Sequence, residues 1–201
     1  MLAVQHVSSP LMARSYRLNR RADTQDDTRQ RIVDSAIELH QTIGPAATTF
    51  SEIARRANVG RVTVYRHFPD EAALARACSG HYFAMHPAPD PASWVPIADP
   101  AERMRAALTD IYAYHRETEA MITRALADSR DQPVMVPYHD HWRRAVDVLA
   151  APFGSRGRTR ILLRAAIGLA IGFDTWRSLV RDQGLDDDQA VLVALRLVSD
   201  A

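Results

Sequence analysis

The chain has 201 residues, of which 47% are hydrophobic and 24% are charged, with 8 glycines and 11 prolines. This composition is typical of a globular protein and excludes collagen-like, low-complexity and disordered chains. The formal charge of +1 excludes a strongly basic or acidic protein, but residues 1–69 hold ten arginines against six acidic residues, so the basic part is at the front.

Cysteine content and hydropathy indicate the compartment. Cys78 is the only cysteine, so no internal disulfide can form, and the first 30 residues lack the continuous apolar core of a signal peptide. The longest apolar run, residues 165–173, has nine residues, about half of what a membrane-spanning helix needs. We therefore expect a cytoplasmic protein without a membrane segment.

Residues 1–24 are predicted to form a mobile basic arm. They contain several arginines among Ser, Asn and Asp and show no sustained periodicity. Such a basic arm could contact phosphate groups, or it could be a tail without a specific contact.

The helical pattern begins at Thr28, where Ile32, Ala36, Leu39 and Ile43 recur at spacings of three and four, and Gly44 is expected to end the helix. In the next segment, Thr49 and Glu52 have the spacing of a reciprocal capping box, which predicts a short second helix. The segment Asn58-Val59-Gly60 interrupts it with residues that tolerate unusual backbone angles, and 61–66 can form about two further turns. Two short helices around a tight turn result.

The remaining segments also predict helices and no strand. A helix opens at Pro69-Asp70 and fades near His86, and five prolines between 87 and 100 predict a loop. Asp99-Pro100 starts the next helix, and further helices are expected at 119–129, 134–151, 158–183 and 187–198, the last two separated by Gly184. The chain is therefore predicted to be all-α. The last two helices share more apolar surface than a small bundle needs, which favours a subunit interface there; the residues concerned are Leu163, Ala166, Ile167, Ala170, Phe173, Val191, Leu192, Leu195 and Val198.

Residues 49–68, with the sequence TFSEIARRANVGRVTVYRHF, closely resemble the helix-turn-helix of TetR/AcrR-type repressors. The most specific parts are Ile53-Ala54, Val59, Thr63-Val64-Tyr65 and His67-Phe68, and the later Trp176-Arg177-Ser178-Leu179-Val180 resembles the C-terminal part of many such regulators. The resemblance implies a three-helix DNA-binding domain at 25–70, followed by a helical ligand-binding and dimerisation domain at 71–201.

By this resemblance, the side chains that contact DNA are Thr49, Ser51, Arg61, Val62, Thr63, Tyr65 and His67. Arg61 and Val62 would read bases, because an arginine can donate two hydrogen bonds to the O6 and N7 atoms of guanine. Thr49 and His67 would contact phosphates, and Thr49 could instead serve only as a helix cap.

Three departures from the family pattern lower the expected DNA affinity. Asp70 and Glu71 stand where the family usually has a phosphate-binding lysine, Asn58 replaces a turn glycine, and Gly60 replaces a helix cap. The arginines of the arm, or Arg29, could compensate for the missing phosphate contact.

In the family, the C-terminal helices form a dimer and a pocket for a small molecule. Large side chains at helical spacings could line such a pocket, and each could equally be ordinary core: Tyr112, His115, Met121, Met135, Tyr138, Trp142, Phe173 and Trp176. No cofactor, metal ion or catalytic residue is expected, because His139 and His141 point in different directions on a helix and no nucleophile or phosphate-binding motif is present.

The reading with most support is a transcriptional repressor that binds a palindromic double-stranded DNA operator as a homodimer through its last two helices. An unidentified small molecule would release it. Two alternatives stay open: a ligand-binding or interaction protein of the same fold with weak or lost DNA binding, and an enzyme that depends on His115 or His139.

Overall fold

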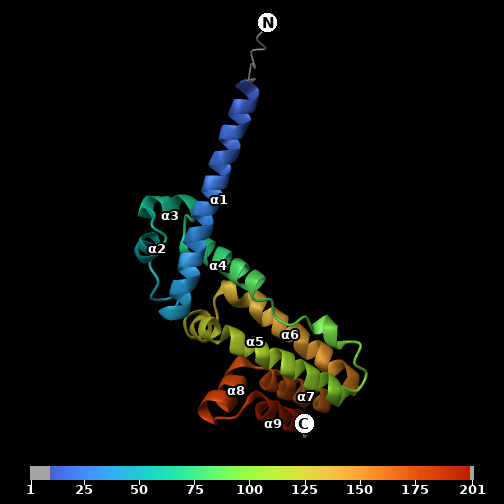
Figure 1. Cartoon of the computed structure of the whole chain (residues 1–201). Coiled ribbons are helices and arrows are strands. Elements are labelled where there is room, and N and C mark those ends of the chain that lie inside the picture. The colour runs from blue at the N-terminus through green and yellow to red at the C-terminus, as the bar shows by residue number, and fades with distance from the viewer. Residues whose placement is uncertain (1–9, 200–201) are drawn as a thin grey trace.

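The computed structural model describes the backbone of residues 10–199 and the side chains of residues 25–199. Within this part the chain is all-α, as predicted, with nine α-helices, short 3₁₀ turns and no strand. Figure 1 shows a small head built on α1, α2 and α3, and a larger helical body, with α4 running from one to the other. No helix in the described part is long and apolar enough to cross a bilayer.

The head contains α1 (Pro10–Thr42), α2 (Phe50–Arg56), α3 (Arg61–His67) and the first part of α4 (Glu71–Met85). Its core is the predicted stripe on α1 together with side chains of the next three helices: Ile32, Val33, Ala36, Leu39, Phe50, Ile53, Ala54, Ala57, Val64, Phe68, Leu74 and Cys78. Ile43, expected to complete the stripe, is 44% exposed because α1 ends at Thr42, and Gly44 follows with φ 90°. Gly44 ends the first helix as predicted.

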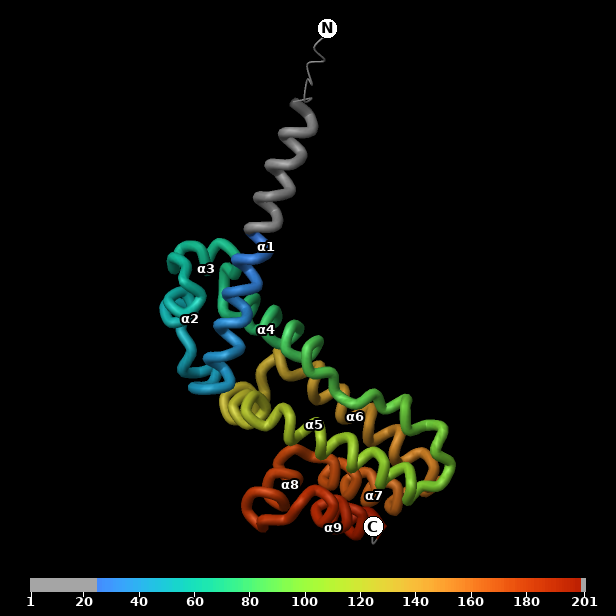
Figure 2. Tube along the Cα trace, viewed as in Figure 1, coloured from blue at the N-terminus to red at the C-terminus, as the bar shows by residue number. Residues whose placement is uncertain are grey.

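The first helix starts earlier than the sequence pattern indicated, at Pro10 rather than at Thr28. Residues 10–24 include Leu, Met, Ala and Arg, which have high helix propensity, but they lack the apolar stripe on which the prediction depended. The side chains of the predicted basic arm, residues 1–24, lie outside the described part of the structure, so its role stays a prediction (Figure 2).

The body contains α5 (Pro100–Ser129), α6 (Val136–Ala150), α7 (Gly157–Ala170), α8 (Phe173–Arg177) and α9 (Asp187–Ser199). Helix α5 is central: it contacts α1, α6, α8 and α9. Asp99 caps it, accepting a hydrogen bond from the Glu102 amide at 2.8 Å, as predicted. The two helices expected on either side of Glu119 are one continuous helix, because no Gly or Pro interrupts residues 101–129.

The helix predicted at 158–183 is broken. Helix α7 ends at Ala170, Gly172 adopts an extended backbone (ψ 140°) and begins α8, and a π-helical turn, η4 (Ser178–Asp182), follows. A Cβ atom on Gly172 would lie 3.2 Å from the Leu169 carbonyl oxygen, so the tight turn suits glycine. The break directs Phe173 and Trp176 inward, where both are buried.

The proline-rich loop between α4 and α5 is held against the end of the body by a buried arginine. Its 3₁₀ turn η1 (Pro91–Trp94) buries Trp94, whose Nε1 donates to the Asp110 carboxylate at 2.9 Å. The Arg103 guanidinium donates to the carbonyl oxygens of Val95 and Ile97, both at 2.7 Å. These bonds satisfy backbone groups that the prolines cannot place in a helix.

Candidate nucleic-acid interface and ligand site

The turn between α2 and α3 has the predicted geometry. The Thr49 hydroxyl accepts a hydrogen bond from the Glu52 amide at 3.2 Å, but the Glu52 carboxylate pairs with Arg55 instead of reaching back to Thr49, so only half of the capping box forms. Asn58 has φ 53°, the left-handed conformation that its side chain tolerates. Gly60 begins α3 without a side-chain cap.

Helix α3 has only seven residues, so its own propensity cannot stabilise it and its neighbours must hold it. Val64 is fully buried and Phe68 is 1% exposed, while Val59 is half-buried against the head core. On the other face, Val62 is 82% exposed and Tyr65 is 44% exposed. An apolar side chain that exposed contributes little to the fold, so this face is available for contact with another molecule.

Arg61, the predicted base-reading residue, is positioned by its own helix. Its Nη2 donates to the Tyr65 hydroxyl at 3.1 Å, and its Cζ lies 5.4 Å from the centre of the Tyr65 ring. The Tyr65 ring in turn packs on Phe50 of α2 at 4.9 Å. This stack limits the motion of a flexible arginine on an exposed helix.

The other predicted DNA contacts surround this face. Thr49 and Ser51 are exposed at the start of α2, and Thr63 is half-buried. His67 is half-buried, and its pKa is lowered by burial first and then by Arg66 and Arg29. A neutral His67 at pH 7 can offer a phosphate a hydrogen bond but no charge.

Among the charged residues near α3, the sequence analysis did not identify Arg66, but it did identify Asp70. Arg66 was not assigned a role, although it is an exposed cation on α3, and the spacing from Val62 could have indicated it. Arg55 and Arg56 are already paired with Glu52 and Glu38. The Asp70 carboxylate accepts from the Ala73 amide at 2.6 Å and caps α4, so it stabilises the fold at the position of the missing lysine.

The structure divides the eight predicted ligand residues into two groups. Six lie in one cluster of rings inside the body, namely Tyr112, His115, Tyr138, Trp142, Phe173 and Trp176. The centre of the His115 ring lies within 6.3 Å of the ring centres of Tyr112, Trp142, Phe173 and Trp176, and the ring centres of Tyr138 and Trp142 are 6.0 Å apart. Met121 and Met135 instead line a groove of about 1100 Å³ between the head and the body.

Tyr114 belongs to the same ring cluster and was not predicted. It lies 6.0 Å from His115 and 5.9 Å from Trp142, ring centre to ring centre. The sequence stripe through Ile111, Tyr112 and His115 describes one side of α5, whereas this central helix is buried on a wider face that includes Tyr114.

His115 is fully buried, and its Nε2 lies 2.9 Å from the Ile171 carbonyl oxygen. A carbonyl can only accept, so Nε2 carries the proton. Burial lowers the pKa of His115 to about 4, so the ring is neutral at pH 7 and Nδ1 is an acceptor.

This burial predicts a pH dependence of stability. The pKa of His115 is lower in the folded chain than in the unfolded chain, so its contribution is complete above pH 6.5 and is lost as the pH falls towards 4. We expect the free energy of unfolding of the wild type to fall by about 3 kcal/mol more than that of His115→Gln between pH 7 and pH 4. Urea unfolding at each pH measures this difference, and equal losses in both proteins would contradict it.

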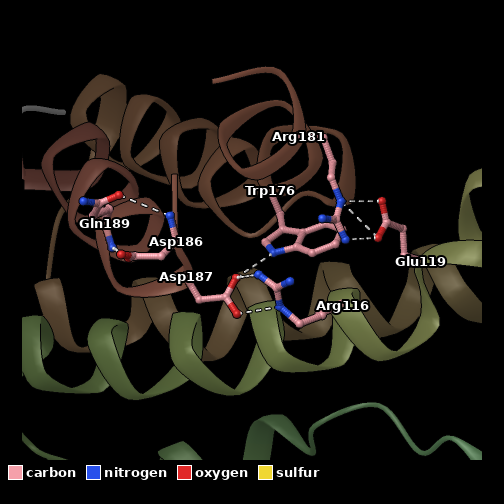
Figure 3. Close-up of polar contacts among 7 residues, drawn as sticks. All are labelled: Arg116, Glu119, Trp176, Arg181, Asp186, Asp187 and Gln189. Carbon is pink, nitrogen blue, oxygen red and sulfur yellow. Dashed lines mark hydrogen bonds and ion pairs between the residues drawn. The ribbon is translucent and has the colours of Figure 1, made fainter. Parts of the chain in front are cut away.

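One wall of the ring cluster is fixed by the polar network in Figure 3. Arg116 of α5 donates to both oxygens of Asp187 at 2.7 and 2.8 Å, and Arg181 of η4 bonds Glu119 of α5 at 2.9 Å. Both guanidinium carbons lie 5.9 Å from the ring of Trp176. The network therefore joins the segment after the α7–α8 break to α5 and to the start of α9.

Comparison with known proteins supports the reading of the head. The family model described as "Bacterial regulatory proteins, tetR family" matches residues 32–78. The chain is 40% identical to the HTH-type transcriptional regulator SrpR of Pseudomonas putida over 52 residues, which are 26% of this chain and 24% of SrpR. It is 42% identical over 50 residues to the uncharacterized HTH-type transcriptional regulator YvkB of Bacillus subtilis, covering 25% of this chain and 26% of YvkB. The matched segment is thus about a quarter of each of these relatives.

A likeness in fold extends over the body as well. The crystal structure of a TetR-like transcriptional regulator from Rhodococcus sp. RHA1 superposes with a TM-score of 0.57 at 17% identity, covering 85% of this chain and 93% of that one. A second regulatory protein of the tetR family from Rhodococcus RHA1 has a TM-score of 0.57 at 21% identity, with 85% and 96% covered. Residues 32–78 are therefore similar to the helix-turn-helix segment of the tetR family, and the chain as a whole has the fold of these solved regulatory proteins.

Proposed function

We propose that the chain is a transcriptional regulator that binds a palindromic operator as a homodimer and is released by a small molecule held in its helical body. The observation that carries the proposal is helix α3, which is held by Val64 and Phe68 and presents Arg61, Val62 and Tyr65 outward. A short helix held in this way fits the major groove of DNA, where base edges can be distinguished.

The proposed homodimer is supported by an exposed apolar surface on α7 and α9, which pack against each other. The residues predicted for this interface are mostly inside the body: Leu163, Ile167, Ala170, Phe173, Val191 and Val198 are 5% exposed or less. The exposed surface comprises Leu192, which was predicted for the interface, together with Ile161, Leu162, Leu169, Val193 and Leu197, each at least 37% exposed. Two copies that pair through this surface would form a symmetric bundle of four helices.

Release by a ligand requires a link between body and head. The Asp128 carboxylate near the end of α5 accepts from the Ala46 amide, in the loop before α2, at 3.0 Å. Between α1 and α4, Gln30 Nε2 lies 3.0 Å from His81 Nε2. Because α4 and α5 both contact the head, a ligand that shifts them within the body would change the position of α3.

Arg61→Ala should weaken DNA binding mainly at one base pair of each half-site. If Arg61 contacts guanine, we expect a loss of about 1 to 3 kcal/mol on the intact site and almost none on sites mutated at that base pair. Fluorescence anisotropy with site variants measures both. Arg105→Ala, which removes the same charge from the exposed side of α5, should leave all affinities unchanged. An equal loss on every site variant would make Arg61 a phosphate contact.

Asp70 and Glu71 favour the alternative of an interaction protein without useful DNA affinity, because both are exposed beside the recognition helix and would repel phosphate. Sedimentation and gel-shift assays on genomic fragments at low salt separate the two functions. The proposed regulator forms dimers and shifts a small set of fragments. Dimers that shift no fragment would establish the alternative instead.

A further inference from the structure

The last turn of α5 contacts the head through the carboxylate of Asp128, where the end of α5 lies beside the end of α1 (Figure 1). Asp128 Oδ2 accepts a hydrogen bond from the Ala46 amide at 3.0 Å, in the α1–α2 loop of residues 43–49. A charged acceptor makes a stronger hydrogen bond than a neutral one. This bond therefore joins two parts of the chain that have separate hydrophobic cores.

Gly44 allows the loop to approach the carboxylate closely. A Cβ atom on Gly44 would lie 2.6 Å from Asp128 Oδ2, which is closer than the two atoms can pack, and 3.7 Å from Arg124 Cδ. The φ angle of Gly44 is 90°, in the left-handed region that favours glycine. The loop therefore lies against Asp128 more tightly than another residue at position 44 would permit.

Hydrogen bonds within the loop connect Ala46 to α2. The Thr48 hydroxyl donates to the Gly44 carbonyl oxygen at 2.7 Å, and the Thr48 amide donates to the Pro45 carbonyl oxygen at 3.1 Å. Thr49 then caps α2. Because these bonds close a tight turn around Ala46, a displacement of Ala46 displaces the start of α2 as well.

Helices α2 and α3 are packed together, so α3 follows α2. Phe50 of α2 packs on Tyr65 of α3 with 4.9 Å between ring centres, and Ile53 of α2 and Val64 of α3 are buried in the same head core. In the body, α5 packs against α9, which carries part of the apolar surface proposed as the dimer interface. Asp128 thus lies on a continuous path from that interface to the recognition helix.

We propose that Asp128 is a positioning residue that sets which spacing of operator half-sites the dimer accepts. This inference rests on the homodimer and the operator proposed above. In a symmetric dimer, the distance between the two α3 helices depends on the angle between each head and its body. Without the bond from Ala46 to Asp128, each head takes a wider range of positions, and the two α3 helices fit several spacings about equally well.

Asp128→Ala removes the acceptor and should reduce the preference for one spacing. When the half-sites are moved apart by one base pair from the best spacing, we expect the affinity of the wild type to fall at least about tenfold, because both heads no longer bind at once. The affinity of Asp128→Ala should fall less than about threefold. Fluorescence anisotropy on an operator series measures this ratio, which a loss of stability alone would leave unchanged.

Two further variants control for charge and for folding. Asp128→Asn keeps an acceptor oxygen for Ala46 and should retain the spacing preference of the wild type to within about twofold. Asp131→Ala removes the same charge from the exposed turn after α5 and should leave the preference unchanged. Thermal unfolding confirms that each variant is folded. An unchanged preference in Asp128→Ala, or an equal loss of preference in Asp131→Ala, would overturn the inference.

The distance between the two α3 helices can also be measured without DNA. Val62 is 82% exposed, so Val62→Cys can carry a nitroxide spin label. Cys78 is buried, and burial raises the pKa of its thiol to about 12, so it stays unlabelled. Double electron–electron resonance should give a narrow distance distribution for labelled Val62→Cys and a broader one when Asp128→Ala is added. Equal widths would contradict the proposal.

The outcome is separable from that of the proposed function. Sequence-selective DNA binding with the same spacing preference in wild type and Asp128→Ala would overturn this inference and leave the regulator intact. A broadened distance distribution in a dimer that binds no operator would support the role of Asp128 in placing the heads and refute the regulator.

Discussion

Leu169→Arg is expected to convert the proposed homodimer to a monomer and to weaken the proposed operator binding by roughly 100-fold or more. Leu169 is 57% exposed on α7 and belongs to the exposed apolar surface of α7 and α9. In a symmetric dimer the substitution places two unpaired charges in an apolar interface, where desolvation is costly. Loss of the dimer also removes the avidity of two linked half-site contacts, which is worth about 100-fold or more.

Sedimentation velocity measures the dimer, and anisotropy measures DNA binding. Met85→Arg is the matched control, because Met85 is a large apolar side chain that is 66% exposed at the end of α4, away from α7 and α9. It should leave both measurements unchanged. If Leu169→Arg remained dimeric, the α7–α9 surface would not be the interface.

Trp176→Ala is expected to destabilise the body by about 3 to 5 kcal/mol. The Trp176 side chain is fully buried, contacts His115 and Phe173, and lies near two guanidinium groups that are themselves paired with Asp187 and Glu119. Its removal leaves a cavity at the wall of the ring cluster that the ion pairs cannot fill. Urea unfolding at fixed protein concentration measures the loss.

Glu119→Ala separates the tryptophan from the network around it. This substitution breaks the ion pair with Arg181 but keeps the Trp176 ring, and the pair is partly exposed. We expect a loss below about 1 kcal/mol. A cost equal to that of Trp176→Ala would mean that the ion pairs, rather than buried apolar surface, hold η4 on α5.

The head could be predicted almost completely from the sequence, because its signals are local. Thr49, Asn58 and Gly44 each define a helix end by their own chemistry, and the spacing of Ile32, Ala36 and Leu39 identifies the core of α1. The Glu52 side chain was less predictable, since a nearby Arg55 competes for it.

The body was predicted with less detail, because its arrangement depends on contacts between distant segments. The only sequence signal for the break at Gly172 is the pair of glycines Gly168 and Gly172. Tyr114 faces inward only because other helices cover α5 on several sides. Likewise, the sequence shows that α7 and α9 have more apolar surface than one bundle needs. Which face of each helix is buried and which is exposed depends on how α7 and α9 pack on α5 and α6. Phe173, which was predicted both for the subunit interface and for the ligand pocket, is buried inside the body.

The most direct test of the central claim is selection of bound sequences from a pool of randomised double-stranded DNA by the purified full chain at low salt. The account predicts an enriched palindrome whose half-sites are about one helical turn apart or a multiple of it, each with a guanine that becomes indifferent in the Arg61→Ala selection. Recovery of no enriched sequence, or of the same sequence with the same guanine preference by wild type and Arg61→Ala, would contradict it.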